Sequence, residues 1–131
     1  MSEKVKRSIE NFELALKKLN EYLSTPVVSD RDRSGVIQAF EFTFELTWKT
    51  LQKLSDDEGL EVSGPKSALK NGFKLGLISS DEEAIYLAML EDRNLMTHTY
   101  REELSKEIFS RIERSYLSVL NRLLKNLKKR S

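Results

Sequence analysis

The sequence predicts an all-α fold: an antiparallel, up-and-down bundle of four to five helices that dimerises, with one domain over residues 1–131. Two observations carry the prediction. Apolar residues recur at three- and four-residue steps with charged residues between them, which is the pattern of amphipathic helices. No segment shows the alternation that is typical of a strand, and the length suits a single domain.

The composition narrows the classes of function. Lys and Arg total 22 against 21 Asp and Glu, so the net charge is +1. This charge creates no overall positive potential that would attract nucleic acid, and any contact with nucleic acid must be local. Because cysteine is absent, disulfides, thiolate catalysis and cysteine-ligated zinc are excluded. No apolar run approaches the ~20 residues of a membrane span. We therefore expect a cytoplasmic protein without membrane contact.

The first helix is predicted from Glu3 to Leu23, and Pro26 follows its end because the residue before a proline avoids the helical region. A polar loop is expected over residues 29–33. The helix carries one apolar stripe, formed by Val5, Ile9, Phe12, Leu16, Leu19 and Leu23.

The second helix is predicted from near Ser34 to about Leu54 and is apolar on two sides. Phe42 and Leu46 form the smaller apolar line. Because so short a chain has little room for a second core, we interpret this line as the contact with a second copy in a homodimer. The main stripe, which includes a tryptophan assigned to the core, is Ile37, Phe40, Phe44, Trp48 and Leu51.

Two shorter helices are expected next. One begins after Gly64, with Pro65 at its first position, and ends at Gly76 in the left-handed conformation. The other begins at Ser80, where Glu83 completes a capping box. Its expected buried residues are Ile85, Ala88, Met89 and Leu95.

The last helix is predicted to start at Thr99, where Glu102 completes a second capping box. Its stripe is of coiled-coil type and comprises Leu104, Ile108, Ile112, Tyr116, Val119, Leu123 and Leu127. Its C-terminal end carries the basic residues Lys125, Lys128, Lys129 and Arg130. These residues either complement the helix dipole or hold an RNA backbone.

Glu41 and Glu45 are a candidate pair of metal ligands, one helical turn apart. No histidine is near, and Lys49 follows at the next turn. We therefore interpret the three residues as an ion-pair ladder and predict neither a metal site nor a cofactor.

The polar residues that could perform chemistry gather at 91–103, around the single histidine. In helical geometry Arg93, Thr97 and Tyr100 share one stripe, and three further residues lie along its neighbour: Asn94, His98 and Arg101. Arginine matches phosphate oxygens, and histidine moves protons near neutral pH, so the patch suits a phosphodiester. Asn94 and Arg101 are then candidate substrate contacts. The alternative is a solvated helix junction whose histidine bonds locally.

Two segments, Phe40–Lys49 and Glu91–Tyr100, resemble the HEPN family, in particular its branch of nucleotidyltransferase substrate-binding proteins. The resemblance covers nearly the whole chain. The family signature is an arginine, four to six residues, then a histidine, and this branch adds a tyrosine two positions later. Arg93, His98 and Tyr100 fit that signature.

The resemblance implies an all-α homodimer that pairs with a minimal nucleotidyltransferase. In such pairs the HEPN protein is often a metal-independent RNase toxin, with Arg93 and His98 catalytic, Asn94 in support, and the nucleotidyltransferase as antitoxin. The partner silences some members by adenylylating the motif tyrosine, here Tyr100. Alternatives remain open: a non-catalytic subunit that presents substrate to the nucleotidyltransferase, a plain helical adaptor, or a Tyr100 that hydrogen-bonds substrate or its own helix start.

Overall fold

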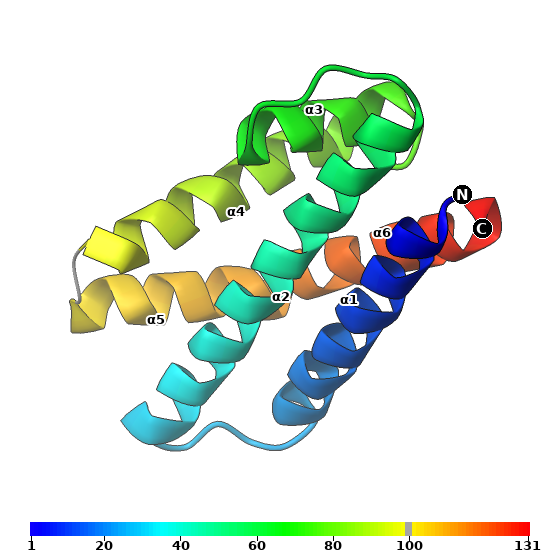
Figure 1. The fold of residues 1–131 in the computed structure, drawn as a ribbon. Coiled ribbons are helices and arrows are strands. Elements are labelled where there is room, and N and C mark those ends of the chain that lie inside the picture. The colour runs from blue at the N-terminus through cyan, green and yellow to red at the C-terminus, as the bar shows by residue number, and fades with distance from the viewer. Residues whose placement is uncertain (99–100) are drawn as a thin grey trace.

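The computed structural model describes residues 1–98 and 101–131, apart from the side chains of Thr97 and His98. This part of the chain contains helices and no strand (Figure 1), so the predicted all-α fold is confirmed. The elements are α1 (Glu3–Leu23), α2 (Asp30–Asp57), α3 (Pro65–Lys74), α4 (Ser80–His98), α5 (Glu102–Arg111), the π-helical turn η1 (Ile112–Tyr116) and α6 (Leu117–Arg130).

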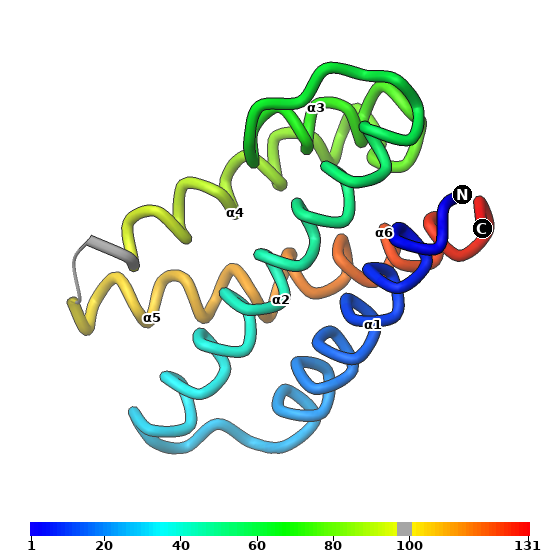
Figure 2. Tube along the Cα trace, viewed as in Figure 1, coloured from blue at the N-terminus to red at the C-terminus, as the bar shows by residue number. Residues whose placement is uncertain are grey.

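Two antiparallel hairpins make up most of the bundle. α1 and α2 form the first, with their lengths in contact, while α3 covers the end of α2. α4 and α5 form the second, and they diverge from the end at which they meet, so that α4 contacts η1 (Figure 1). α5, η1 and α6 follow one another without a break, and the trace in Figure 2 shows them as one long rod that passes α2 and α1. In the described part of the chain, no helix is long and apolar enough to cross a membrane. The homodimer stays a prediction.

α1 has the predicted bounds, but α2 begins four residues before the predicted Ser34. The Ser29 hydroxyl caps α2 by accepting a hydrogen bond from the Asp32 N–H, at 3.1 Å. Asp30 and Asp32 then complement the positive end of the helix dipole. The predicted polar loop over residues 29–33 is therefore wrong, because its polar residues are the cap and the first turn of the helix.

The later helix starts also differ from the expected register. α3 begins at Pro65, and Gly76 adopts a left-handed φ of 77°, both as predicted. α4 begins at Ser80, but its capping box lies one residue earlier than predicted. The Ser79 N–H donates to Glu82 Oε1, at 3.2 Å, and the Glu82 N–H donates to Ser79 Oγ, at 3.3 Å.

The last helix begins later than the sequence predicts. α5 begins at Glu102, and Arg101 before it has extended backbone. Glu102 is therefore the first helical residue and cannot close a capping box that begins three residues earlier. Thr99, where the sequence places the start, lies outside the described residues.

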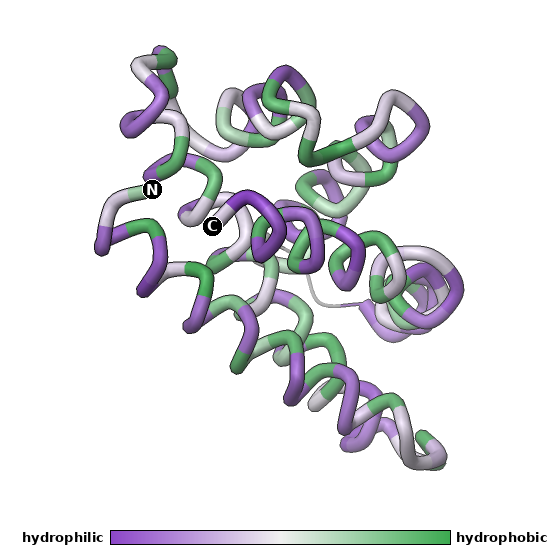
Figure 3. The backbone as a smooth tube through the Cα atoms, turned by 90° about the vertical axis from the view of Figure 1, so that its right-hand side faces the viewer, coloured by the Kyte–Doolittle hydropathy of each residue, from purple (hydrophilic) through white to green (hydrophobic). Residues whose placement is uncertain are grey.

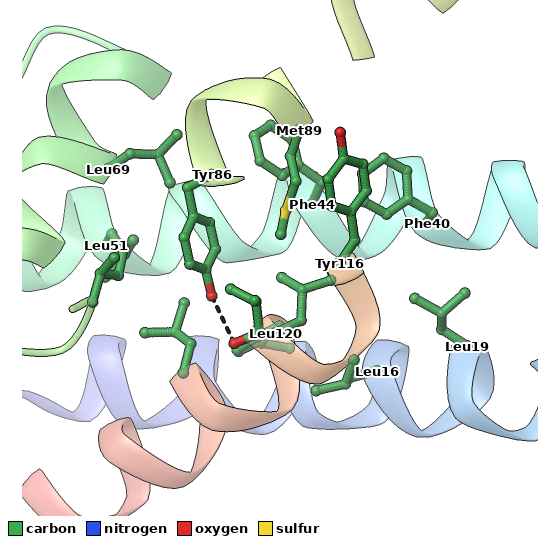
Figure 4. Packing of buried hydrophobic residues seen from close by; sticks show 14 of the residues in the cluster. Leu16, Leu19, Phe40, Phe44, Leu51, Leu69, Tyr86, Met89, Tyr116 and Leu120 are labelled. Atoms are coloured by element: carbon green, nitrogen blue, oxygen red, sulfur yellow. Dashed lines mark hydrogen bonds between the residues drawn. The ribbon is translucent and has the colours of Figure 1, made fainter. Parts of the chain in front are cut away.

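The core forms where the apolar stripes of the helices meet, and Figure 3 shows apolar and polar residues interleaved along each helix. All seven residues of the predicted stripe on the last helix are buried. In the core interior the Phe40 and Tyr116 rings stack, with centroids 5.4 Å apart (Figure 4). Tyr86, which the sequence analysis missed, is also buried there and donates its O–H to the Val119 carbonyl, at 2.9 Å.

Several of the burial predictions need correction. Leu95 was expected to be buried, but its side chain is 43% exposed, because it lies on the α4 face that points away from the core. Ile85 and Ala88 are only partly buried, whereas Met89 is fully buried. Trp48 packs at the edge of the core and is half-buried.

Candidate functional site

The C-terminal half of α4 brings the candidate catalytic arginine against α2. The guanidinium of Arg93 forms an ion pair with Glu45 of α2, and its Nη1 donates to Asn94 Oδ1, at 3.0 Å. Glu45 also accepts a hydrogen bond from Trp48 Nε1, at 3.2 Å. The side chains of Arg93 and Glu45 are both half-buried. Arg93 is thereby held in one orientation by groups from two helices.

This pairing corrects the ladder that the sequence predicted. Glu45 contacts Arg93 rather than Lys49, whose ammonium lies over the Trp48 ring, 5.9 Å from its centroid. In the described residues, no group of three or more histidine and acidic side chains could hold a metal ion. Glu45 therefore pairs across two helices with Arg93 and not along its own helix.

Glu41 gives this cluster a second carboxylate. Burial raises the pKa of Glu41, the charge of Arg93 lowers it, and the charge of Glu45 raises it, with a net increase. The arginine therefore lies near two acidic groups of α2, and Glu45 pairs with it directly. A second anion, such as a phosphate, must compete with Glu45 for the guanidinium.

Asp92, the residue before Arg93, anchors α4 to the long rod. Its side chain is buried, and it accepts hydrogen bonds from Arg111 Nε and Nη2, both at 2.8 Å. The Tyr116 O–H also donates to Asp92, at 2.5 Å. Burial, followed by the bond to Asp92, raises the pKa of Tyr116 well above its ordinary value. Since Tyr116 closes the π-helical turn, this network fixes α4 against that turn.

An apolar groove of about 580 Å³ lies on the other flank of α2, against α1. Phe42 and Leu14 are 62% and 66% exposed, and both line the groove with Leu46 and Ala39. The second apolar side that the sequence predicted for this helix is therefore confirmed. We refer below to these four residues as the apolar face.

The remaining predicted site residues are placed only in part. Asn94 is exposed beside Arg93, and Arg101 is exposed just before α5. His98 is the last residue of α4, one helical turn after Asn94, and its side chain lies outside the described residues, as does all of Tyr100. The structure thus brings Arg93 and Asn94 together, while the grouping with His98, Tyr100 and Arg101 stays a prediction.

A family model described as nucleotidyltransferase substrate binding protein like matches residues 7–129 of this chain. The chain belongs to this family. The predicted membership is thereby confirmed. A curated relative in Haemophilus influenzae, named "Probable ribonuclease HepT", is 27% identical over 110 residues, which cover 80% of this chain and 73% of the relative.

Two solved structures resemble this member of the nucleotidyltransferase substrate binding protein like family. A protein of Thermus thermophilus is 38% identical with a TM-score of 0.74, and the match covers 91% of this chain and 97% of that one. A protein of Haemophilus influenzae, described as having the fold of a substrate binding domain of a nucleotidyltransferase, is 25% identical with a TM-score of 0.64. That match covers 95% of this chain and 96% of the other.

The sequence does not predict two acidic side chains, Asp92 and Glu45, that hold α4 and Arg93 in place. Asp92 stands inside the quoted motif, but its partners Arg111 and Tyr116 lie 19 and 24 residues away, and the sequence indicates only a core role for Tyr116. Glu45 was considered only as a metal ligand or ladder member. The only signal in the sequence is the acidic residue directly before the motif arginine, and its burial is known from the structure alone.

Proposed function

We propose that this protein is a metal-independent endoribonuclease that acts as a homodimer and pairs with a minimal nucleotidyltransferase as its antitoxin. One observation carries the proposal: Arg93 is oriented by Glu45 and Asn94 at the junction of α2 and α4, and Asp92 beside it anchors the helix that ends at the only histidine. The name of the Haemophilus influenzae relative supports ribonuclease activity.

The chemistry needs a base, an acid and a positive charge. The 2′-hydroxyl gives its proton to a base and attacks the adjacent phosphorus, the bond to the 5′-oxygen breaks, and an acid protonates that oxygen. The products are a 2′,3′-cyclic phosphate and a 5′-hydroxyl end. Arg93 neutralises the charge that builds on the phosphoryl oxygens. Because each chain has one histidine, His98 from each of two subunits supplies the base and the acid.

The position of Phe42, the α2 residue of the apolar face that is most exposed, supports a site shared between two subunits. Phe42 and Glu45 are three residues apart, so their side chains leave the helix about 60° apart around its axis. A two-fold contact through Phe42 therefore places the Arg93–Glu45 pair of each subunit at the rim of the interface. The homodimer would also cover apolar side chains that the monomer exposes to water.

The dimer is tested by substituting the most exposed residue of the apolar face on α2. Phe42→Glu should convert a dimer into a monomer in light scattering at micromolar concentration, and its circular dichroism should remain helical because Phe42 is outside the core. A wild-type protein that is monomeric under these conditions would remove the shared site.

RNA cleavage is tested with His98→Ala. The wild type should cleave a labelled single-stranded RNA in EDTA and leave a 2′,3′-cyclic phosphate, whereas His98→Ala should be inactive with unchanged circular dichroism. Arg93→Ala should be similarly inactive, and Arg7→Ala, on the exposed side of α1, serves as the matched control. Cleavage by His98→Ala at the wild-type rate would falsify the role of this histidine.

A second candidate function is a non-catalytic subunit that presents substrate to the nucleotidyltransferase. The family description and the Haemophilus influenzae structure favour it. Wild-type protein that cleaves no RNA but raises the activity of its cognate nucleotidyltransferase would support this function instead.

Tyr100 is proposed as the residue that the nucleotidyltransferase modifies. Exposed Arg101 beside it can hold an added phosphate, and the attached AMP would fill the space that RNA needs. Incubation with the cognate enzyme, ATP and magnesium should add AMP to the peptide that contains Tyr100, and Tyr100→Phe should lose it. An unmodified peptide, with the partner shown active on another substrate, would contradict this regulation.

A further inference from the structure

An open cleft of about 1030 Å³ lies between α3 and α4 and reaches the candidate site. One wall is α3 with the segment before it, and the other wall is formed by Leu90, Arg93 and Asn94 of α4. The cleft and the Arg93 region are therefore one continuous surface. We refer to it as the α3–α4 cleft.

A row of lysines gives the α3–α4 cleft its charge. Lys66, Lys70 and Lys74 line it at successive turns of α3, and all three side chains are exposed. In the part of the chain that the structure describes, none of the three forms an ion pair. Together with Arg93, which is itself paired with Glu45, the lysines place four basic side chains along the cleft, and Glu61 is the one acidic side chain in its described lining. The protein as a whole has a net charge of only +1, so this charge is concentrated locally.

The spacing of the lysines suits a chain of phosphates. Residues four apart on a helix rise about 6 Å, so the row spans about 12 Å in two equal steps. Neighbouring phosphates of one nucleic acid strand have a comparable separation. The N-terminal end of α3, which has no side-chain cap, opens into the same cleft and adds the positive end of its dipole.

Hydrogen bonds of a buried side chain hold the α3 wall of the cleft in place. Asn71 is buried at its base and donates from Nδ2 to Ser55 Oγ and to the Glu61 carbonyl, both at 3.0 Å. These bonds join α3, α2 and the segment that leads into α3. The described lining contains no phenylalanine, tyrosine or tryptophan, so bases have no aromatic side chain on which to stack.

The geometry points to the α3–α4 cleft as the track for single-stranded RNA that leads to Arg93. This inference rests on the proposed function and adds where the substrate lies. The lysines hold successive phosphates, and Arg93 holds the phosphate at the end of the row. Because every contact is to the backbone, binding is independent of base sequence and falls steeply with salt.

Binding is tested with a 12-nucleotide 2′-O-methyl RNA, which lacks the attacking hydroxyl and cannot be cleaved. Lys66→Ala/Lys70→Ala/Lys74→Ala should raise its Kd on the order of 100-fold at 0.1 M salt, since three single-strand phosphate contacts are lost. The slope of log K against log salt should become about 2 units shallower. The corresponding triple arginine variant keeps the charge and should bind like the wild type.

The matched control removes three positive charges elsewhere. Lys4→Ala/Lys6→Ala/Arg7→Ala changes exposed basic residues of α1 outside the cleft and should bind within a few-fold of the wild type. Equal losses in the two triple variants, or no loss in the cleft variant, would overturn the inference. An acidic peptide of equal charge that binds as tightly would overturn it too, and would assign the cleft to an acidic protein partner.

The same assay separates the two proposals. A wild type that binds the uncleavable RNA through the cleft lysines, but cleaves no RNA, would retain this inference and reject the ribonuclease. If the wild type and the triple alanine variant of the cleft lysines cleave RNA equally well, the ribonuclease proposal is retained and the RNA path through the cleft is rejected. Failure of the wild type to bind the oligonucleotide also rejects the track.

Discussion

Asp92 and Arg93 are neighbours on α4, and each is paired with a residue of opposite charge, but the two pairs differ in environment. Asp92 is 5% exposed and accepts three hydrogen bonds from Arg111 and Tyr116. Arg93 and Glu45 are each 28% exposed, so both side chains keep part of their surface in contact with water. A buried pair stabilises the fold only while both partners remain, whereas a half-exposed pair contributes little. The first pair is therefore an anchor, and the second can exchange its carboxylate for a phosphate.

The largest effect is expected from Asp92→Ala, which leaves Arg111 and Tyr116 without their acceptor. We expect a loss of about 3 kcal/mol in the free energy of unfolding, measured by urea denaturation. Arg111 remains partly exposed, which keeps the loss below that of a fully enclosed pair. Glu13→Ala, which breaks the exposed pair with Lys128, is the control and should change stability by less than about 1 kcal/mol. Equal effects would remove the distinction between anchor and surface pair.

Tyr116→Phe should have the next largest effect, because it removes one hydrogen bond to a charged acceptor and keeps the ring that stacks on Phe40. The expected loss is about 2 kcal/mol in urea denaturation. Tyr22→Phe, at an exposed tyrosine of α1, should leave the midpoint unchanged. A Tyr116→Phe protein as stable as the wild type would show that Asp92 is held by Arg111 alone.

Glu45→Gln should change the free energy of unfolding by less than about 1 kcal/mol, because both side chains of its pair with Arg93 are partly exposed. Its effect should be functional. With the competing carboxylate removed, Arg93 should hold phosphate more readily, and the uncleavable RNA should bind more tightly in a fluorescence titration. Asp57→Asn, an exposed carboxylate at the end of α2, is the matched control. Weaker RNA binding by Glu45→Gln would mean that the orientation of Arg93 by Glu45 matters more for binding than the competition between Glu45 and phosphate.

The smallest effect is a pH dependence at Glu41. Its pKa is raised in the folded protein above the ordinary value of 4.5, so the folded state binds this proton more tightly than the unfolded state. The charged carboxyl therefore destabilises the fold as pH rises above 4.5 and through the raised value. Glu41→Gln should be slightly more stable than the wild type at pH 7, and the difference should vanish at pH 3. Thermal unfolding at the two pH values measures it.

The sequence predicted the helices well because each apolar stripe is a local pattern. The bounds of α1 and the burial of the stripe on the last helix follow from spacing alone. The start of α2 was missed because a serine cap and acidic first-turn residues have the composition of a loop. The capping box of α4 was misplaced by one residue because Ser79–Glu82 and Ser80–Glu83 match the same pattern.

The site was predicted less completely, because its contacts join distant segments. Arg93 was found from its motif, but its pairing with Glu45 crosses two helices whose packing no local pattern specifies. The same holds for the bond from Tyr116 to Asp92, 24 residues apart. Tyr116 appeared in the sequence only as a stripe residue, since periodicity records which face a side chain lies on and not what its hydroxyl reaches.

The two chain ends lie side by side, at the end of the molecule away from the α4–α5 junction (Figure 1). Lys128 pairs with Glu13 and Arg130 with Glu58, so the last turn of α6 is fastened to the first hairpin. An affinity tag, a dye or a surface linker on either end would therefore lie at the end of the molecule away from the C-terminal end of α4. A short flexible peptide could also join the two ends, and a new opening in the segment between α1 and α2 would give a circular permutant with the same bundle.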